Sequence, residues 1–346
     1  MGAPRLTIGF LLVMIVGASA VEAASKARRR PVRRAAPRTP SLILPADPSP
    51  RDREVGEACR RALGRSSGAV VAMDPRTGRV MALVNPAHAL FKAYQPCSVF
   101  KIVVGIAGLS EGIVTPETPY TCAGGCWMWP GHGSITLRRA LAVSCNPYFE
   151  WIGEQLGYER IQRYAQLFGL GSPTGINLTG ETPGRMPAEV RPALVGHLSS
   201  HAAGIATSAV QLAVLLSATV NGGVVLQPQV QGPERFVARE RWRLPASTVL
   251  EGLAEGFVGA VNEGSASSAF DPELVVAGKT GSCSSVGWFA SYAPAERPEI
   301  VVVVFLRPGN GHHASAVAGR IYQDLYRPSA VTESSPPAGT DADGVP

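Results

Sequence analysis

The residues of this sequence with the clearest chemical potential are a serine and a lysine three positions apart. Ser98 and Lys101 stand at the start of an apolar run, residues 102–109. Side chains three residues apart share one face of a helix, so the hydroxyl and the amine would lie together. A lysine enclosed by apolar side chains loses its charge more readily and becomes a base. A serine beside such a base becomes a nucleophile, so the pair predicts covalent catalysis.

Two further motifs supply more polar groups of this kind. Ser144 and Asn146 lie in a short turn between two expected helices. Lys279, Thr280 and Gly281 lie on an expected strand that enters an apolar sheet. Each motif is a weak signal alone, but the order and the setting of all three indicate one catalytic site that is built from distant segments.

Three cysteines and a histidine form a second candidate site. Cys122, Cys126, His132 and Cys145 supply three thiols and one imidazole, a set that suits tetrahedral zinc. A disulfide between Cys122 and Cys126 is the alternative, and an oxidising compartment would favour it. Both interpretations stay open at this point.

The remaining residues of chemical interest give weaker signals. Cys97 and Cys283 flank the first and third motifs, where they either approach each other or serve as small core residues. His197 and His201 are four residues apart, but no glutamate completes a metalloprotease motif, so we interpret both as structural. Glu181 lies in an expected surface turn and receives no catalytic role.

The elements that must position these residues are strands near both chain ends with helices between them. Strands are expected at residues 68–73, 79–84, 274–281, 286–292 and 300–305. Helices are expected at residues 54–63, 137–143, 148–156, 160–168, 207–220, 247–261 and 314–326, and residues 169–198 are expected to be rich in loops. This order predicts an α/β (α+β) fold: an antiparallel sheet from both chain ends, flanked by helices, with a mostly helical insert.

The chain is expected to hold one catalytic domain between two non-globular ends. Residues 1–24 have the apolar run and small residues of a signal peptide or an anchor. Residues 25–53 read as a basic linker that is rich in proline and arginine. The domain is expected at 54–327 and a disordered tail at 328–346.

The charge distribution limits the partners of the chain. The formal net charge of +6 comes mainly from the linker, and the remainder is close to neutral. Aromatic residues are absent from the basic run, so we expect no nucleic-acid partner. The protein is predicted to be exported to the periplasm or cell envelope. Membrane association is expected only through the N-terminus, as an anchor if this segment stays uncleaved.

The three motifs resemble the S-x-x-K, S-x-N and K-T-G set of penicillin-binding proteins and serine β-lactamases. The hairpin at residues 73–82, the stretch at 131–146 and the strand at 287–294 are similar to the transpeptidase branch, and in motif to its elongation class. The resemblance covers residues 67–326 and implies the β-lactamase/transpeptidase-like fold.

The resemblance also implies a role for each motif residue. Ser98 would attack the carbonyl of a D-Ala-D-Ala peptide or a β-lactam, with Lys101 as its base. Ser144 would relay the proton to the leaving amine, and Lys279 would tune the electrostatics of this step. Asn146 would hydrogen-bond the amide side chain of the substrate.

The third motif would form the substrate-binding edge of the site. Thr280, Gly281 and Ser282 line this edge in the family pattern, and the hydroxyls of Thr280 and Ser282 would hold the terminal carboxylate. The backbone N–H groups of Ser98 and Ser282 would form an oxyanion hole. No cofactor is expected for catalysis.

The implied function is a serine D,D-transpeptidase that acts on peptidoglycan stem peptides and binds β-lactams through an acyl-enzyme on Ser98. A D,D-carboxypeptidase or a β-lactamase of the same fold is one alternative, although the polar Asn146 argues against class D β-lactamases. A non-catalytic β-lactam-binding sensor is another alternative. Elongation-class relatives hold a structural zinc near the equivalents of His132 and Cys145, with carboxylates as the other ligands.

Overall fold

The computed structural model describes a subset of the chain, namely residue 2 and residues 39–230, 238–243 and 248–327. Nearly all of the predicted signal peptide or anchor and all of the predicted tail lie outside the described residues. Among these residues, no helix combines the length and the apolar character that crossing a membrane requires.

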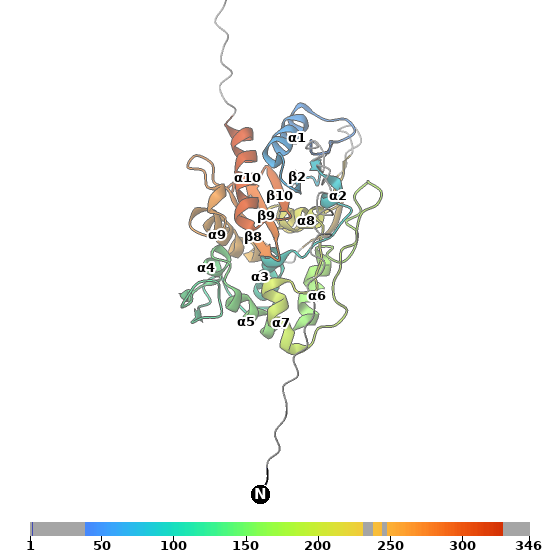
Figure 1. The fold of residues 1–346 in the computed structure, drawn as a ribbon. Helices are drawn as coiled ribbons and strands as arrows, with labels where there is room; N and C mark the ends of the chain where they lie inside the picture. Colours follow the sequence, from blue (N-terminus) through green and yellow to red (C-terminus); the bar gives the residue numbers. More distant parts are fainter. Residues whose placement is uncertain (1, 3–38, 231–237, 244–247, 328–346) are drawn as a thin grey trace, which may run out of the picture. The chain divides into compact units, whose positions relative to one another are not determined.

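The fold is built around a six-stranded antiparallel sheet (Figure 1). The strand order is β1-β3-β2-β10-β9-β8, so strands from the two chain ends meet at β2 and β10. The strands are β1 (Leu42–Ile43), β2 (Gly68–Met73), β3 (Val80–Val84), β8 (Ala277–Cys283), β9 (Val286–Ala293) and β10 (Ile300–Leu306). The predicted sheet from both chain ends is therefore confirmed.

Helices cover both faces of this sheet, and β10 shows why. Its side chains alternate: Val301 and Val303 belong to the core cluster that contains α8 (Ala209–Val220). Val302 and Val304 belong to the cluster that contains α1 (Pro50–Leu63) and α10 (Gly311–Tyr326). A strand that is buried on both faces reads as a continuous β-branched run, as this strand does.

The remaining elements form the helical insert and its connections. Its helices are α2 (Pro86–Ala89), α3 (Lys101–Ser110), α4 (Leu137–Ala142), α5 (Asn146–Leu156), α6 (Tyr158–Leu167), α7 (Pro192–His201) and α9 (Thr248–Asn262), with the 3₁₀ turns η1 (Cys97–Phe100) and η3 (Ser267–Ala269). Two small hairpins pair β4 (Tyr120–Cys122) with β5 (Gly133–Ile135) and β6 (Val224–Leu226) with β7 (Glu240–Arg243).

The ordered structure begins upstream of the predicted boundary at residue 54. β1 pairs with β3, and α1 begins at Pro50, so the linker prediction is wrong for the part of 25–53 that carries these elements. Ser49 and Asp52 form a capping box at the start of α1. Asp52 also pairs with Arg79, whose Nη2 lies 2.6 Å from its carboxylate. The linker prediction was based on the proline- and arginine-rich composition of this stretch, which gives no indication of these specific contacts.

The loop-rich prediction for residues 169–198 is also partly wrong, because α7 begins inside it at Pro192. Proline at the first helical position is a start signal that the composition of this stretch obscured. Together with α5, α7 forms the wall on which part of the candidate site is built.

Candidate active site

Ser98 lies in the 3₁₀ turn η1, and Lys101 is the first residue of α3. Residues i and i+3 of a 3₁₀ turn lie one above the other, so the predicted common face is present, although on a tighter helix than expected. Five hydrophobic residues of α3 are fully buried, and the Lys101 side chain is itself 0% exposed. This burial lowers the pKa of Lys101 to about 7.

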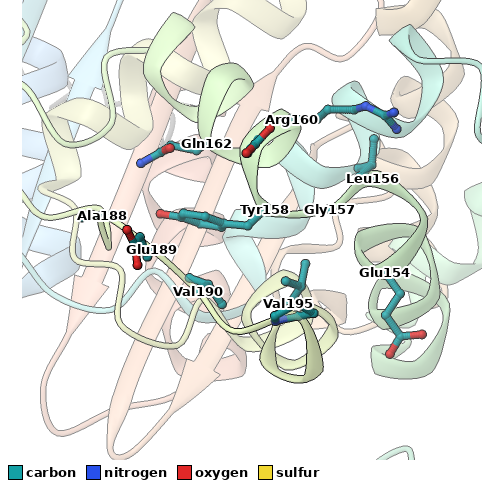
Figure 2. Close-up of a pocket in the computed structure, with 12 residues that line it drawn as sticks. Glu154, Leu156, Gly157, Tyr158, Arg160, Gln162, Ala188, Glu189, Val190 and Val195 are labelled. Atoms are coloured by element: carbon teal, nitrogen blue, oxygen red, sulfur yellow. The ribbon is translucent and has the colours of Figure 1, made fainter.

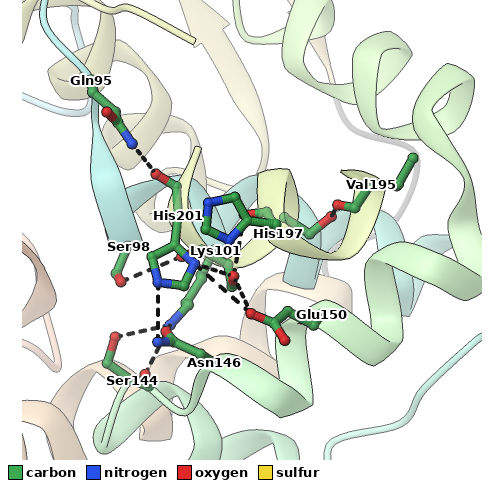
Figure 3. A network of polar contacts seen from close by, with 11 residues as sticks. Gln95, Ser98, Lys101, Ser144, Asn146, Glu150, Val195, His197 and His201 are labelled. Carbon is green, nitrogen blue, oxygen red and sulfur yellow. Dashed lines mark hydrogen bonds and ion pairs between the residues drawn. The ribbon is translucent and has the colours of Figure 1, made fainter. Parts of the chain in front are cut away.

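The Lys101 amine contacts the second motif (Figure 3). Its Nζ donates to the Ser144 carbonyl at 2.8 Å, to Asn146 Oδ1 at 2.6 Å and to Ser144 Oγ at 3.3 Å. Ser98 Oγ donates to the carbonyl of Ser200 at 3.5 Å. Within the described part of the chain, no hydrogen bond joins Ser98 Oγ directly to Lys101 Nζ.

Ser144 lies between two buried amines. Lys279 Nζ donates to Ser144 Oγ at 2.8 Å, opposite the contact from Lys101. Burial and then the charge of Lys101 hold the pKa of Lys279 well below its ordinary value. The backbone of Ser144 has a φ of 56°, which is rare for a residue with a side chain. This backbone strain occurs at a residue whose side chain contacts two buried amines, which indicates that the site requires Ser144 in this conformation.

The third motif forms the opposite wall, on β8. Thr280 Oγ1 lies 2.6 Å from Ser265 Oγ, and Ser282 Oγ accepts from the Gly311 N–H at 2.8 Å. A side chain at Gly281 would place its Cβ 2.7 Å from the carbonyl of Pro96. Glycine is therefore required here for β8 to approach the serine turn closely.

A disulfide fastens the same two elements together. Cys97 and Cys283 are bonded, which settles the alternative that the sequence left open. Cys97 immediately precedes Ser98, and Cys283 immediately follows Ser282. The bond therefore links the chain segments on both sides of the predicted oxyanion hole.

These groups surround a pocket of about 240 Å³. It is lined by Ser98, Trp127, Ser144, Asn146, His201, Ser265, Thr280 and Ser282. The structure thus brings all three predicted motifs together, with Lys101 and Lys279 buried behind the pocket surface.

Three lining residues were missed by the sequence reasoning: Trp127, His201 and Ser265. Trp127 donates from its indole to the carbonyl of Val143 at 2.9 Å, yet its side chain remains largely exposed. Ser265 follows α9 and carries no motif, so only its spatial position beside Thr280 identifies it. His201 was interpreted as structural, and the structure places its imidazole at the pocket wall.

His201 is the middle member of a polar chain that leaves the pocket (Figure 3). Asn146 Nδ2 lies 3.3 Å from His201 Nε2, and His201 Nδ1 lies 2.5 Å from Ser200 Oγ. Ser200 Oγ donates to Glu150 Oε1 at 2.8 Å. Burial, followed by the charges of His197 and Lys101, lowers the pKa of His201, so the ring is neutral at physiological pH.

The predicted thiol–imidazole cluster also comes together in space. The ligand atoms of Cys122, Cys126, His132 and Cys145 all lie within 4.8 Å of one another, and the three cysteines are free thiols. His132 Nε2 is buried and has no hydrogen-bond partner among the described residues. Three thiols and an unpartnered imidazole nitrogen fit a tetrahedral zinc ion.

A larger hollow of about 720 Å³ lies elsewhere, between the end of α5, the start of α6 and the segment that leads into α7 (Figure 2). Its lining includes Glu154, Tyr158, Arg160 and Glu189, and none of the three motifs contributes to it. Size alone would have selected this hollow, whereas the chemistry lies in the smaller pocket.

The site is thus a serine hydroxyl beside two buried amines, on an antiparallel sheet that is covered by helices. The family model of the penicillin binding protein transpeptidase domain matches residues 68–327. That match spans more than half of the chain, so the chain belongs to the penicillin-binding protein transpeptidase domain family.

Two relatives and one solved structure illustrate the similarity. Stage V sporulation protein D of Bacillus subtilis is 27% identical over 311 residues, which cover 75% of this chain and 48% of the relative. Peptidoglycan D,D-transpeptidase MrdA of Haemophilus influenzae is 26% identical over 343 residues, which cover 75% and 52%. The chain therefore spans about half the length of these two relatives.

The solved structure is penicillin-binding protein A from M. tuberculosis as an imipenem acyl-enzyme complex. It superimposes with a TM-score of 0.69 at 23% identity, over 79% of this chain and 78% of that chain. This likeness shows that the two chains share a fold.

Proposed function

We propose that the protein is a penicillin-binding D,D-transpeptidase that forms an acyl-enzyme on Ser98 with peptidoglycan stem peptides ending in D-Ala-D-Ala. One observation carries this proposal: Lys101 and Lys279, both 0% exposed, contact the same Ser144 hydroxyl at the pocket that contains Ser98. The names of the relatives, which include peptidoglycan D,D-transpeptidase, support the same activity.

Acylation would begin with proton transfer from Ser98 Oγ to the neutral amine of Lys101. With a pKa of about 7, Lys101 holds a substantial neutral fraction at physiological pH. The serine oxygen then attacks the substrate carbonyl carbon. The backbone N–H groups of Ser98 and Ser282 would receive the negative charge that develops on the carbonyl oxygen.

The leaving amine would then take a proton through Ser144. Its hydroxyl contacts both Lys101 and Lys279, so it can pass on one proton and be resupplied from a buried amine. In a peptide the released group is D-alanine, whereas in a β-lactam the amine stays attached to the acyl-enzyme. Thr280 and Ser282 would bind the carboxylate of either substrate.

The acyl group would finally pass to the amine of a second stem peptide, which forms a cross-link. If water takes the place of the amine, the protein is a D,D-carboxypeptidase or a β-lactamase. If neither reacts, it is a β-lactam-binding sensor. We infer an envelope location on the exported side of the membrane, because the proposed substrate is found there.

We also propose a structural zinc at Cys122, Cys126, His132 and Cys145. The bound ion would cross-link the β4–β5 hairpin to the turn that carries Ser144 and Asn146. Metal analysis of the purified protein tests this proposal: one tightly held zinc per chain supports it. A zinc-free protein in which Cys122 and Cys126 are released only by reductant contradicts it.

Mass spectrometry with benzylpenicillin tests the acylation step. We expect a stable adduct on Ser98 in the wild-type protein, none in Ser98→Ala, and an unchanged adduct in the exposed control Ser267→Ala. Acylation of Ser98→Ala at the wild-type rate would contradict the assignment.

The fate of the acyl group requires a second measurement, with a stem pentapeptide as substrate. A cross-linked dimer supports the transpeptidase, whereas tetrapeptide alone supports the carboxypeptidase. Rapid loss of the penicillin adduct supports a β-lactamase, and a permanent adduct without peptide turnover supports the sensor.

A further inference from the structure

A second group of potential metal ligands lies beside the active site, outside the zinc cluster. His197 and His201 are four residues apart on α7, and Glu150 comes from the neighbouring helix α5. One ligand atom from each of the three residues lies within 4.8 Å of the others. Helices α5 and α7 pack against each other, and this packing brings the three side chains together.

The three side chains are open to solvent on one side. His197 is exposed, and the side chains of His201 and Glu150 are 35% and 33% exposed. The two imidazole rings are stacked with their centroids 4.4 Å apart, at 24° to each other. Figure 3 shows both rings and the Glu150 carboxylate converging at the end of α7.

The chemistry of these donors selects a class of ligand. Two imidazoles four residues apart on a helix present their nitrogens to one point, and a carboxylate adds a negative charge. Imidazole suits Zn²⁺, Cu²⁺ and Ni²⁺, and two histidines with one glutamate leave a coordination position open. The spacing of His197 and His201 in the sequence did not indicate a metal site, because the carboxylate of Glu150 comes from a different helix.

The nitrogen that faces this point can be assigned from the neighbouring contacts. A lysine amine donates to Asn146 Oδ1, so the Asn146 amide must present its Nδ2 to His201 Nε2. His201 Nε2 is then the acceptor, and Nδ1 carries the proton toward Ser200. Nδ1 is also the atom that lies 3.9 Å from Glu150 Oε1.

A cation on His201 Nδ1 would change this arrangement. The neutral ring can bind through Nδ1 only as the tautomer that carries its proton on Nε2. A proton on Nε2 would then face the Asn146 amide donor at 3.3 Å, and two donors repel each other. Asn146 would have to turn its Oδ1 toward His201, which removes the acceptor of the hydrogen bond from Lys101 Nζ.

We propose that Glu150, His197 and His201 form a second transition-metal site, with Zn²⁺ as its natural ligand, and that its occupation slows acylation of Ser98 through Asn146. The effect on acylation rests on the proposed function, whereas metal binding does not. Binding of free metal at the mouth of the pocket thereby inhibits the acylation of Ser98.

Cobalt titration of the full chain tests the binding step, because Co²⁺ on thiolates gives strong near-ultraviolet charge transfer that nitrogen and oxygen ligands lack. We expect one further equivalent of Co²⁺ without charge transfer. Loss of an outer-shell partner already costs metal affinity about tenfold or more. His197 would be a direct ligand, so His197→Ala should weaken binding of the further Co²⁺ equivalent at least that much. The control His313→Ala removes an exposed histidine from α10 and should bind as the wild type does.

The coupling is tested with a fluorescent penicillin, with and without excess Zn²⁺. We expect slowing of up to about a hundredfold in the wild type, which is the cost of a misplacement of about 1 Å at a catalytic centre. The acylation rate of His197→Ala should match that of the wild type without zinc and should not fall when zinc is added.

The metal site is overturned if His197→Ala and His313→Ala bind the further Co²⁺ equivalent equally, or if the wild type does not bind it. Binding without slowing overturns the coupling, and a protein never acylated under any condition contradicts the proposed function alone.

Discussion

At the scale of single residues, the site depends on amines that the fold keeps away from water. Lys101 and Lys279 are both fully buried and both contact Ser144. Two ammonium charges this close in an apolar interior disfavour each other, so burial and mutual repulsion both favour a neutral amine. A neutral amine of this kind can accept a proton at neutral pH.

The first prediction concerns the pH dependence of acylation. Because burial lowers the pKa of Lys101 to about 7, the base form is depleted below that pH and predominates above it. The acylation rate with a fluorescent penicillin should rise through about pH 7 and then level off. Lys101→Arg should be slow at every pH, since a guanidinium keeps its proton. A flat wild-type profile from pH 5 to 9 would exclude Lys101 as the base.

The second prediction concerns Ser265, which contacts Thr280 Oγ1 at 2.6 Å. Ser265→Ala should leave Thr280 less well oriented toward the substrate carboxylate. A hydrogen bond contributes about 0.5–1.5 kcal/mol, so the second-order acylation rate should fall by roughly two- to twelvefold. The exposed Ser267→Ala is the matched control, and equal rates in the two variants would contradict the role.

At this scale the sequence predicted most of the residues of the candidate site, because short motifs contain them. Ser98, Lys101, Ser144 and Lys279 belong to these motifs, and the structure brings them together. His201 and Ser265 have no motif, because their positions depend on how α7 and α9 pack. Residues that act through spatial proximity alone leave no local pattern to read.

At the scale of elements, the serine turn and β8 are held together by covalent and steric means. The Cys97–Cys283 disulfide joins them at one point, and the absence of a side chain at Gly281 permits close approach at another. The two predicted oxyanion donors lie one on each element. Their separation is therefore fixed before any substrate arrives, which is the condition for effective oxyanion stabilisation.

The third prediction follows from this disulfide. Removing it in Cys97→Ser/Cys283→Ser should slow acylation, because the donors lose their fixed separation, and should lower the melting temperature. The bond closes a sequence separation of 186 residues, for which the chain-entropy argument gives about 5 kcal/mol. Acylation kinetics and thermal melting measure the two effects. Cys59→Ala, at a buried free cysteine far from the motifs, should melt lower but acylate normally.

Strands were easier to predict than the segments that join them. β10 is a run of β-branched residues buried on both faces, and its composition alone identifies it. By contrast, β1 consists of two residues and is defined by its pairing with β3. An element this short carries no periodicity, so composition led to the prediction of a linker.

At the scale of the whole molecule, residues ahead of the family match stabilise the sheet. α1 packs against α10, and the buried carboxylate of Asp52 pairs with Arg79 next to β3. Burial opposes the charge of Asp52, but hydrogen bonds from Arg79 and Ser49 prevail and lower its pKa below the ordinary 3.8. The contact therefore links the N-terminal segment to the first hairpin.

The fourth prediction is that Asp52→Asn destabilises the protein in a pH-dependent way. A carboxyl whose pKa is lower in the folded state stabilises the fold above its unfolded pKa, and this contribution disappears as the pH falls through the folded value. Removing one partner of a buried pair costs about 3–5 kcal/mol. Thermal melting should show a clear deficit at pH 7 that shrinks below pH 3.8. A deficit independent of pH would contradict the ion-pair explanation.

The position of β10 has a consequence for how this chain is made. β10 lies between β2 and β9, so the interior of the sheet is completed by the strand that is synthesised last among the described residues. β2 cannot find its long partner until more than two hundred further residues have been translated, and folding dominated by such distant pairings is slow. The β2–β3 hairpin and the helices of the insert can form earlier, but the sheet cannot close around β10 until synthesis is almost finished. Closure of the central sheet is thus a late event in the life of the chain, and it is set by the order of the strands along the sequence.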